Sequence, residues 1–255
     1  MELIPLRYFT SNTFTAVDFY IAAALFTSII VIVAVCGKLV FKNDRKKLSW
    51  VIGSFSGLVM SILGILYVYH KVPLYNDFLF YGDNGPDLFE HTDDVANMAS
   101  LFFGIANVLD LFFGCLFYRK ELGILTAWVH HSLFIWISIA STTGNGLFMT
   151  NPPFASSFMF MCVEEIPTVV LGVGTLFPAF RTDWGFGIPF ITTRVLYHGY
   201  ITSYAIIMYF RGIGVSTHIP ILYSLTFIMY FNWALGWVKM MMKKRKLKSK
   251  SKKSS

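Results

Sequence analysis

Two adjacent histidines, His130 and His131, lie near the middle of an apolar stretch, residues 122–140, that is long enough to cross a bilayer as a helix. Ionisable side chains at such depth are costly, so they usually face the interior of a helix bundle or a wet cavity. A histidine can take up a proton or form hydrogen bonds near neutral pH. The pair therefore predicts a site inside the membrane.

Three further apolar stretches place ionisable groups at overlapping depths. Asp110 lies about seven residues from the end of the stretch 95–117, which is about 10 Å at a rise of 1.5 Å per residue. Because carboxylates, histidines and an arginine recur at one depth, we expect them to surround a common cavity. The other members of this set are Glu164 and Glu165 in residues 154–176, and Arg194 and His198 in residues 187–210.

Helical phase predicts which of these side chains face the same way. Arg194 and His198 are four residues apart and therefore share one face of a helix. Adjacent residues diverge by about 100°, so His130 and His131 are not expected to point to one spot. We expect one histidine to face the cavity and the other to bond a neighbouring helix.

Pro167 directly follows the segment that carries the two glutamates. A proline inside a helix leaves the carbonyl four residues earlier, here that of Val163, without its donor and bends the helix. The bend is expected to turn a glutamate and this carbonyl toward the cavity. Two plainer alternatives stay open: Asp110 and Arg194 form a buried ion pair, and His198 is a hydrogen-bonded packing residue.

The composition predicts a membrane protein before any segment is assigned. Of the 255 residues, 55% are hydrophobic and 14% are charged, whereas a soluble domain carries about 25% charged residues. Stretches of about 20 apolar residues cross the hydrocarbon core as helices. We therefore expect an all-α fold, a polytopic membrane bundle of about seven transmembrane helices. The expected spans are residues 17–36, 50–69, 95–117, 122–140, 154–176, 187–210 and 219–241.

The lysines and arginines predict the orientation, because they collect on the cytosolic side of membrane proteins. Nine of the 21 lie between Lys239 and Lys253, at the end of the last span and directly after it. With this tail in the cytosol, seven spans put the amino terminus in the lumen, and the cytosolic segments hold 17 of the 21. Contact with anionic lipid headgroups explains the basic tail better than nucleic-acid binding does.

The remaining candidate features predict no metal centre and no cofactor. The six histidines are too few for a di-iron site, and their spacing matches no zinc motif. The acidic loop at residues 70–94 lacks the full pattern of a calcium loop and is expected to be a solvated luminal segment. The cysteines fall within spans, where a thiol behaves as a small hydrophobe, so no disulfide is expected.

The order of the polar residues resembles the TLC-domain family, which includes ceramide synthases and the translocating-chain-associating membrane protein. The resemblance implies a bundle of membrane helices around a cavity that opens toward the cytosol. The residues that carry it are Asp110, the pair His130 and His131, the run Glu165-Ile166-Pro167-Thr168, and the run Ile191-Thr192-Thr193-Arg194.

The resemblance also divides the chain. The TLC domain would span residues 45–242, after an N-terminal luminal segment and first transmembrane helix, residues 1–44, and before a basic cytosolic tail, residues 243–255. Ceramide synthases carry a second cluster containing a His-Asp pair one span after the His-His pair, where this chain has Phe160 to Glu165 without one. The resemblance is therefore to the branch outside the ceramide synthases.

The first function expected from these features is lipid binding. The protein would bind or sense a lipid in the intramembrane cavity and so influence membrane lipid composition. Its partners would be membrane lipids, a phospholipid or a sphingolipid, with acyl-CoA as a further candidate and no nucleic acid. The expected lipid-binding residues are Glu164, Glu165, Arg194 and His198.

The alternative is a lipid N- or O-acyltransferase of the ceramide-synthase type. A neutral histidine would remove the proton from the attacking amine or hydroxyl, and an acidic neighbour would orient its ring. His131 is the expected base, with Asp110 or Glu165 as the orienting group. In this reading the catalytic residues would be His130, His131 and Asp110.

The end of the chain predicts a compartment. Lys252 and Lys253 stand at positions minus four and minus three, which resembles the dilysine retrieval signal of endoplasmic-reticulum membrane proteins. A generic basic tail in another endomembrane or in the plasma membrane is the alternative. A homodimer is also a candidate, because small residues allow helices to approach closely. The glycines concerned are Gly53, Gly57, Gly172 and Gly174.

Overall fold

The computed structural model describes residues 15–42, 44–71, 93–143, 145–146, 149–150, 155–212 and 217–251. Within these ranges the regular secondary structure is helical apart from one antiparallel pair of two-residue strands, β1 (Asn145–Gly146) and β2 (Met149–Thr150). The all-α class expected from the sequence is confirmed. Most of the acidic loop and the pair Lys252 and Lys253 lie outside the described residues.

Each expected span corresponds to helical structure, but three of them are built from several shorter elements. The unbroken helices are α1 (Ala16–Phe41), α3 (Val51–Lys71), α5 (Asp94–Phe117) and α11 (His218–Ser251), with the short α2 (Arg45–Leu48) before α3. The composite segments are η5 (Ile124–Val129) with α6 (His130–Thr143), α7 (Ala155–Met161) with η6 (Cys162–Glu165) and α8 (Ile166–Leu176), and α9 (Asp183–Pro189) with η8 (Phe190–Tyr197) and α10 (His198–Phe210). Two 3₁₀ turns, η4 (Arg119–Glu121) and η7 (Pro178–Phe180), lie in the connections.

Five helices in the described part of the chain are long and apolar enough to cross a membrane. Many large apolar side chains on their outer faces are exposed, as expected for helices that face lipid. These findings support a membrane protein. The stretches 122–140 and 187–210 are helical but are not among the five. The candidate spans are Val17–Phe41, Arg45–Lys71, Asp94–Phe117, Ala155–Leu176 and Ile219–Lys246.

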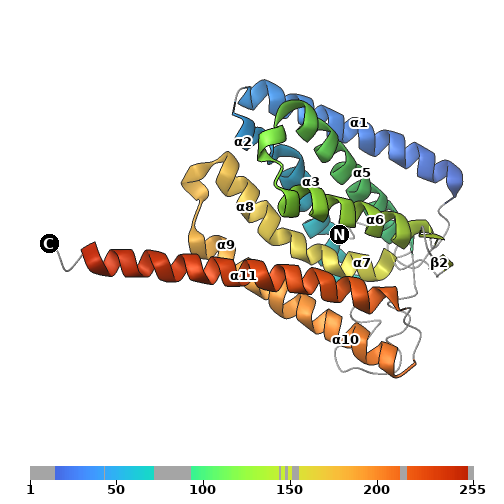
Figure 1. The fold of residues 1–255 in the computed structure, drawn as a ribbon. Helices are drawn as coiled ribbons and strands as arrows, with labels where there is room; N and C mark the ends of the chain where they lie inside the picture. Colours follow the sequence, from blue (N-terminus) through green and yellow to red (C-terminus); the bar gives the residue numbers. More distant parts are fainter. Residues whose placement is uncertain are drawn as a thin grey trace.

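The helices form one packed bundle. In Figure 1, α1, α5 and α6 lie on one side of the molecule, α10 and α11 on the other, and α3, α7 and α8 between them. Large side chains such as Met60, Tyr67, Phe160 and Tyr204 are fully buried in the middle of this arrangement. The long α11 extends past its neighbours at its C-terminal end (Figure 1).

Asp93 ties two helices together at one end of the bundle. One carboxylate oxygen caps α5 by accepting the Ala96 N–H at 2.9 Å, which satisfies a free donor of the first turn. The other lies 3.0 Å from Lys71 Nζ and accepts the Tyr67 hydroxyl at 2.7 Å. All three side chains are buried. Lys71 was expected in a solvated luminal loop, and its pairing with Asp93 is not predicted by the sequence.

Glycines let α3 and α8 pack closely. A Cβ added at Gly172 would meet the Cβ of Ser54 at 2.9 Å, and one added at Gly57 would meet Thr168 at 3.4 Å. A Cβ at Gly53, on the same helix as Gly57, would meet nothing within 4 Å. Two of the glycines that suggested a homodimer therefore serve packing within the chain.

Gly172→Ala is expected to lower the thermal midpoint of unfolding of the purified protein in detergent, because overpacking a tight contact costs about 1–3 kcal/mol. Gly53→Ala is the matched control. Its methyl group has free space, and replacing a helical glycine by alanine favours folding by about 0.5–1 kcal/mol. A midpoint for Gly172→Ala equal to or above that of the wild type would contradict the close packing of α3 on α8.

Candidate functional site

A pocket of about 410 Å³ lies between α3, α8, η8, α11 and the start of α6, and we call it the histidine pocket. Its walls combine ionisable groups with large apolar side chains, among them two tryptophans and two phenylalanines. An amphipathic lining of this kind suits a ligand with both an apolar and a polar part. The polar residues that line it include Asp110, Glu121, His130, His131, Thr168 and Arg194.

Both adjacent histidines line the histidine pocket, so the expectation that only one faces the cavity is wrong. His130 packs against Phe134, with ring centroids 4.6 Å apart, and its ring centroid lies 6.0 Å from that of Trp233. His131 turns toward Asp110 instead. The two rings do diverge, but the pocket is wide enough to receive both. Among the described residues, neither Nδ1 atom has a hydrogen-bond partner.

Asp110 is held beside His131 by a tyrosine. The Tyr118 hydroxyl donates to Asp110 Oδ1 at 2.5 Å and to its backbone carbonyl at 3.1 Å. Burial, together with the neighbouring Asp110 carboxylate, raises the pKa of Tyr118, so its hydroxyl keeps its proton. Asp110 Oδ2 lies 3.5 Å from His131 Nδ1. The buried ion pair of Asp110 with Arg194 is not formed, because Arg194 pairs with Glu165.

Arg194 is bonded to three other residues. Its Nε donates to the Glu164 carbonyl at 2.8 Å, and its Nη2 donates to Thr168 at 2.7 Å and to Glu165 Oε1 at 3.2 Å. The guanidinium also lies 4.9 Å from the ring centroid of Tyr230, which is cation–π distance. Arg194 therefore forms part of the wall of the histidine pocket with its charge already balanced by Glu165.

The helix before Pro167 does not leave a free carbonyl at Val163. The residues of η6 take up a 3₁₀ turn, in which the Ile166 N–H donates to the Val163 carbonyl. The prediction of a free Val163 carbonyl is therefore wrong, because the α-helical bonding pattern does not continue up to the proline. The carbonyl that is used by a neighbouring helix is that of Glu164, which accepts from Arg194 at 2.8 Å.

Local departures from α-helical geometry surround the site. A π-helical segment, η5, ends directly before His130, and a second, η8, contains Arg194. The two glutamates lie in the 3₁₀ turn η6. π-helical turns are rare and occur frequently at functional sites. Two segments that carry predicted residues, η6 and η8, thus depart from regular α-helical geometry, and a third, η5, directly precedes the histidine pair.

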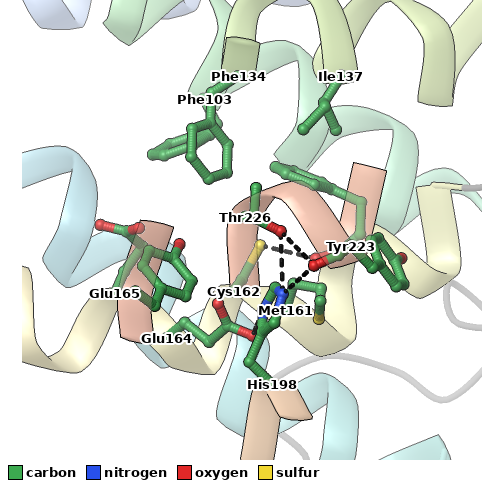
Figure 2. A pocket seen from close by; sticks show the side chains of 12 residues that line it. Phe103, Phe134, Ile137, Met161, Cys162, Glu164, Glu165, His198, Tyr223 and Thr226 are labelled. Atoms are coloured by element: carbon green, nitrogen blue, oxygen red, sulfur yellow. Dashed lines mark hydrogen bonds and ion pairs between the residues drawn. The ribbon is translucent and has the colours of Figure 1, made fainter. Parts of the chain in front are cut away.

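Glu164 and His198 form a second, deeper cluster (Figure 2). Glu164 Oε1 lies 2.7 Å from His198 Nδ1, and the other ring nitrogen lies 2.9 Å from both the Tyr223 carbonyl and Thr226 Oγ1. His198 is 2% exposed. The cavity at this cluster measures about 30 Å³, too small for a lipid chain. His198 is therefore a hydrogen-bonded packing residue, which was one of the alternatives left open by the sequence.

The structure thus divides the predicted residues into two groups that meet at Arg194, which pairs with Glu165 and donates to the Glu164 carbonyl. The residues in the wall of the histidine pocket are Asp110, His130, His131 and Arg194. Those in the wall of the deeper cavity are Glu164, Glu165 and His198.

Sequence reasoning missed several residues of both groups. Tyr118, Tyr223, Tyr230 and Thr226 supply hydrogen bonds or a ring face to the predicted ionisable groups. The sequence could have indicated Tyr118, because it follows Asp110 by only eight residues, at the end of the same helix. The others lie on α11, whose pairing with α10 and η8 no local pattern predicts.

No three His, Cys, Asp or Glu side chains of the described residues gather closely enough to hold a metal ion. Comparison of the chain with family models, with curated proteins and with solved structures found no match in any of the three. Membership of the TLC-domain family therefore stays a prediction from its motif residues.

Arg194→Met is expected to lower the free energy of unfolding by about 3–5 kcal/mol, because it leaves the buried Glu165 carboxylate without its cation. The double variant Arg194→Met/Glu165→Met removes both charges and should recover most of this loss. Thermal and denaturant unfolding in detergent would measure both. A double variant no more stable than the single one would show that the ion pair is not the reason for the loss.

Proposed function

We propose that this chain is a multi-pass membrane protein of the TLC-domain type that binds or senses a lipid in the histidine pocket and thereby influences membrane lipid composition. The observation that carries the proposal is the pocket itself. It offers about 410 Å³ beside two histidines and an aspartate, and its apolar wall includes Trp50, Phe190 and Trp233. An acyl chain would lie along these rings, with a polar group near the histidines.

The finer features of the proposal are seven spans in the endoplasmic-reticulum membrane, a luminal amino terminus and a cavity that opens toward the cytosol. Two observations support them. The stretches 122–140 and 187–210 are helical, as the other expected spans are. Glu121 and Ser49 line the pocket and adjoin Lys120 and the basic segment Arg45–Leu48, which the charge rule assigns to the cytosol.

Filling the pocket tests the proposal. Gly53 lines the histidine pocket, and a Cβ there meets no other atom within 4 Å, so a larger side chain can extend into the space. Gly53→Leu is expected to remove most of the lipid that copurifies with the protein, as measured by native mass spectrometry. The thermal midpoint should stay near that of the wild type.

Gly53→Ala is the matched control, since a single methyl group is too small to fill the pocket. It should retain lipid as the wild type does. Retention of the same lipid, in the same amount, by Gly53→Leu would show that the histidine pocket is not the binding site.

The contact of His131 with Asp110 favours a second candidate function, the lipid acyltransferase. Asp110 Oδ2 lies 3.5 Å from His131 Nδ1, and apo enzymes often show such catalytic contacts longer than hydrogen-bond distance. With Nδ1 toward the carboxylate, Nε2 would accept the proton of an attacking amine or hydroxyl. The proton would then pass to the leaving group as the acyl bond to the acceptor forms and the bond to the carrier breaks.

Proteoliposomes with a sphingoid base and a long-chain acyl-CoA would measure this reaction. If the protein is an acyltransferase, His131→Ala should lower the rate by about 10²–10⁴, the usual contribution of a general base. Tyr118→Phe should lower it less, because it only frees Asp110 to move. Absence of transfer by the wild type, in liposomes where it retains lipid, would leave lipid binding as the function.

A further inference from the structure

A second pocket adjoins the histidine pocket, and we call it the basic pocket. It measures about 400 Å³ and lies between α8, α9 and α11. Leu171 and Phe186 line both pockets, so the two share a wall. The basic pocket differs in its polar groups, which include Arg181 and Lys244.

The charges of the basic pocket leave an excess of one positive charge. Lys244 Nζ bonds both carboxylate oxygens of Asp183, at 2.9 Å and 2.7 Å. Asp183 is the only carboxylate among the described residues that line the pocket. The side chain of Arg181 forms no ion pair with any residue that the structure describes. One guanidinium is therefore available to a ligand.

Trp237 adds a hydrogen-bond donor without an acceptor. Its indole packs against Gly187 and lies edge-on to Trp184, with ring centroids 5.6 Å apart. The Nε1 atom is buried and has no hydrogen-bond partner within the described part of the chain. An indole N–H can only donate, and leaving a buried donor unpaired is unfavourable. Trp237 also lines the basic pocket, so a ligand oxygen there would satisfy this donor once the indole turns toward the cavity.

The basic pocket lies where the membrane spans end. Arg181 follows the span Ala155–Leu176, and Lys244 is in the last turn of the span Ile219–Lys246. Arg181 can sit close against α8 because Gly174 has no side chain: a Cβ there would meet the Arg181 Cβ at 3.3 Å. Lipid phosphates lie at this level of a bilayer, and basic side chains at span ends attract them.

We propose that the basic pocket binds the phosphate of an acyl-chain amphiphile whose apolar part passes between the shared side chains Leu171 and Phe186 into the histidine pocket. Arg181 would bond two phosphate oxygens with its planar guanidinium, the geometry that distinguishes arginine from lysine. Trp237, in the wall of the pocket, would donate to a further oxygen after its indole turns toward the ligand. This inference rests on the proposed lipid binding. Arg181 supplies the free cation for an anionic group. Arg194 cannot do so, because it is already paired with Glu165.

Two sources of such a phosphate exist, a phospholipid headgroup and a nucleotide that carries an acyl chain. Binding of three palmitoyl compounds to the purified full-length chain in detergent would distinguish them. Palmitoyl lysophosphatidic acid represents the first source, palmitoyl-CoA the second, and palmitoylglycerol has the chain without a phosphate. Dissociation constants would be measured by thermophoresis for the wild type and two variants.

Arg181→Gln should weaken binding of at least one phosphate compound about ten-fold, which is about 1.4 kcal/mol, and should leave palmitoylglycerol binding unchanged. The compound whose affinity falls more identifies the source of the phosphate. Arg245→Gln is the matched control: it removes the same charge next to Lys244 in the same helix, but Arg245 does not line the pocket. It should change no affinity.

The outcomes separate this inference from the function on which it rests. If palmitoylglycerol binds and Arg181→Gln weakens no phosphate compound more than Arg245→Gln does, the phosphate inference is wrong and lipid binding stands. If none of the three compounds binds the wild type, the phosphate inference is wrong; if the wild type also copurifies with no lipid, both are wrong.

Discussion

The buried guanidinium of Arg194 is the constraint on which the middle of this structure depends. A charge in an apolar bundle must be paired and hydrogen-bonded, or it costs several kcal/mol. Here its partners come from three elements: the carbonyl and the carboxylate of η6, the hydroxyl of Thr168 on α8, and the ring of Tyr230 on α11. Satisfying one side chain therefore fixes how η8 meets α8 and α11, and these elements form part of the wall of the histidine pocket.

The irregular helical turns follow from the same requirement. In a regular helix, Glu164 and Glu165 would diverge by about 100°, and their backbone carbonyls would be used within the helix. The 3₁₀ turn η6 lets Glu164 reach His198 with its carboxylate while its carbonyl accepts from Arg194. η8 places Arg194 and His198 so that both bond this one turn. The pairing of Arg194 with Glu165 and of Glu164 with His198 thus offsets the energetic cost of distorting the two helices.

Much of the fold could be predicted because it depends on local properties. Apolar length locates the helices, and the rarity of charges inside them singles out Asp110, His130, His131 and Arg194. The pairing of these groups could not be predicted, since it depends on helical phase through η5 and η8 and on helices distant in sequence. The ion pair of Asp93 with Lys71 could not be predicted for a similar reason. Polar residues at helix ends are typical of loops, and only the packing of α3 against α5 brings these two together.

The division of the charges bears on what the histidine pocket can recognise. Arg194 is balanced by Glu165, and the pocket also contains the carboxylates of Asp110 and Glu121. Its electrostatic character is therefore not cationic, and an anionic group would find no free counter-charge among these residues. A neutral hydroxyl, amide or amine needs no counter-charge and suits this lining better. An anionic part of the same ligand would lie where an unpaired guanidinium is available, beyond the shared wall of Leu171 and Phe186.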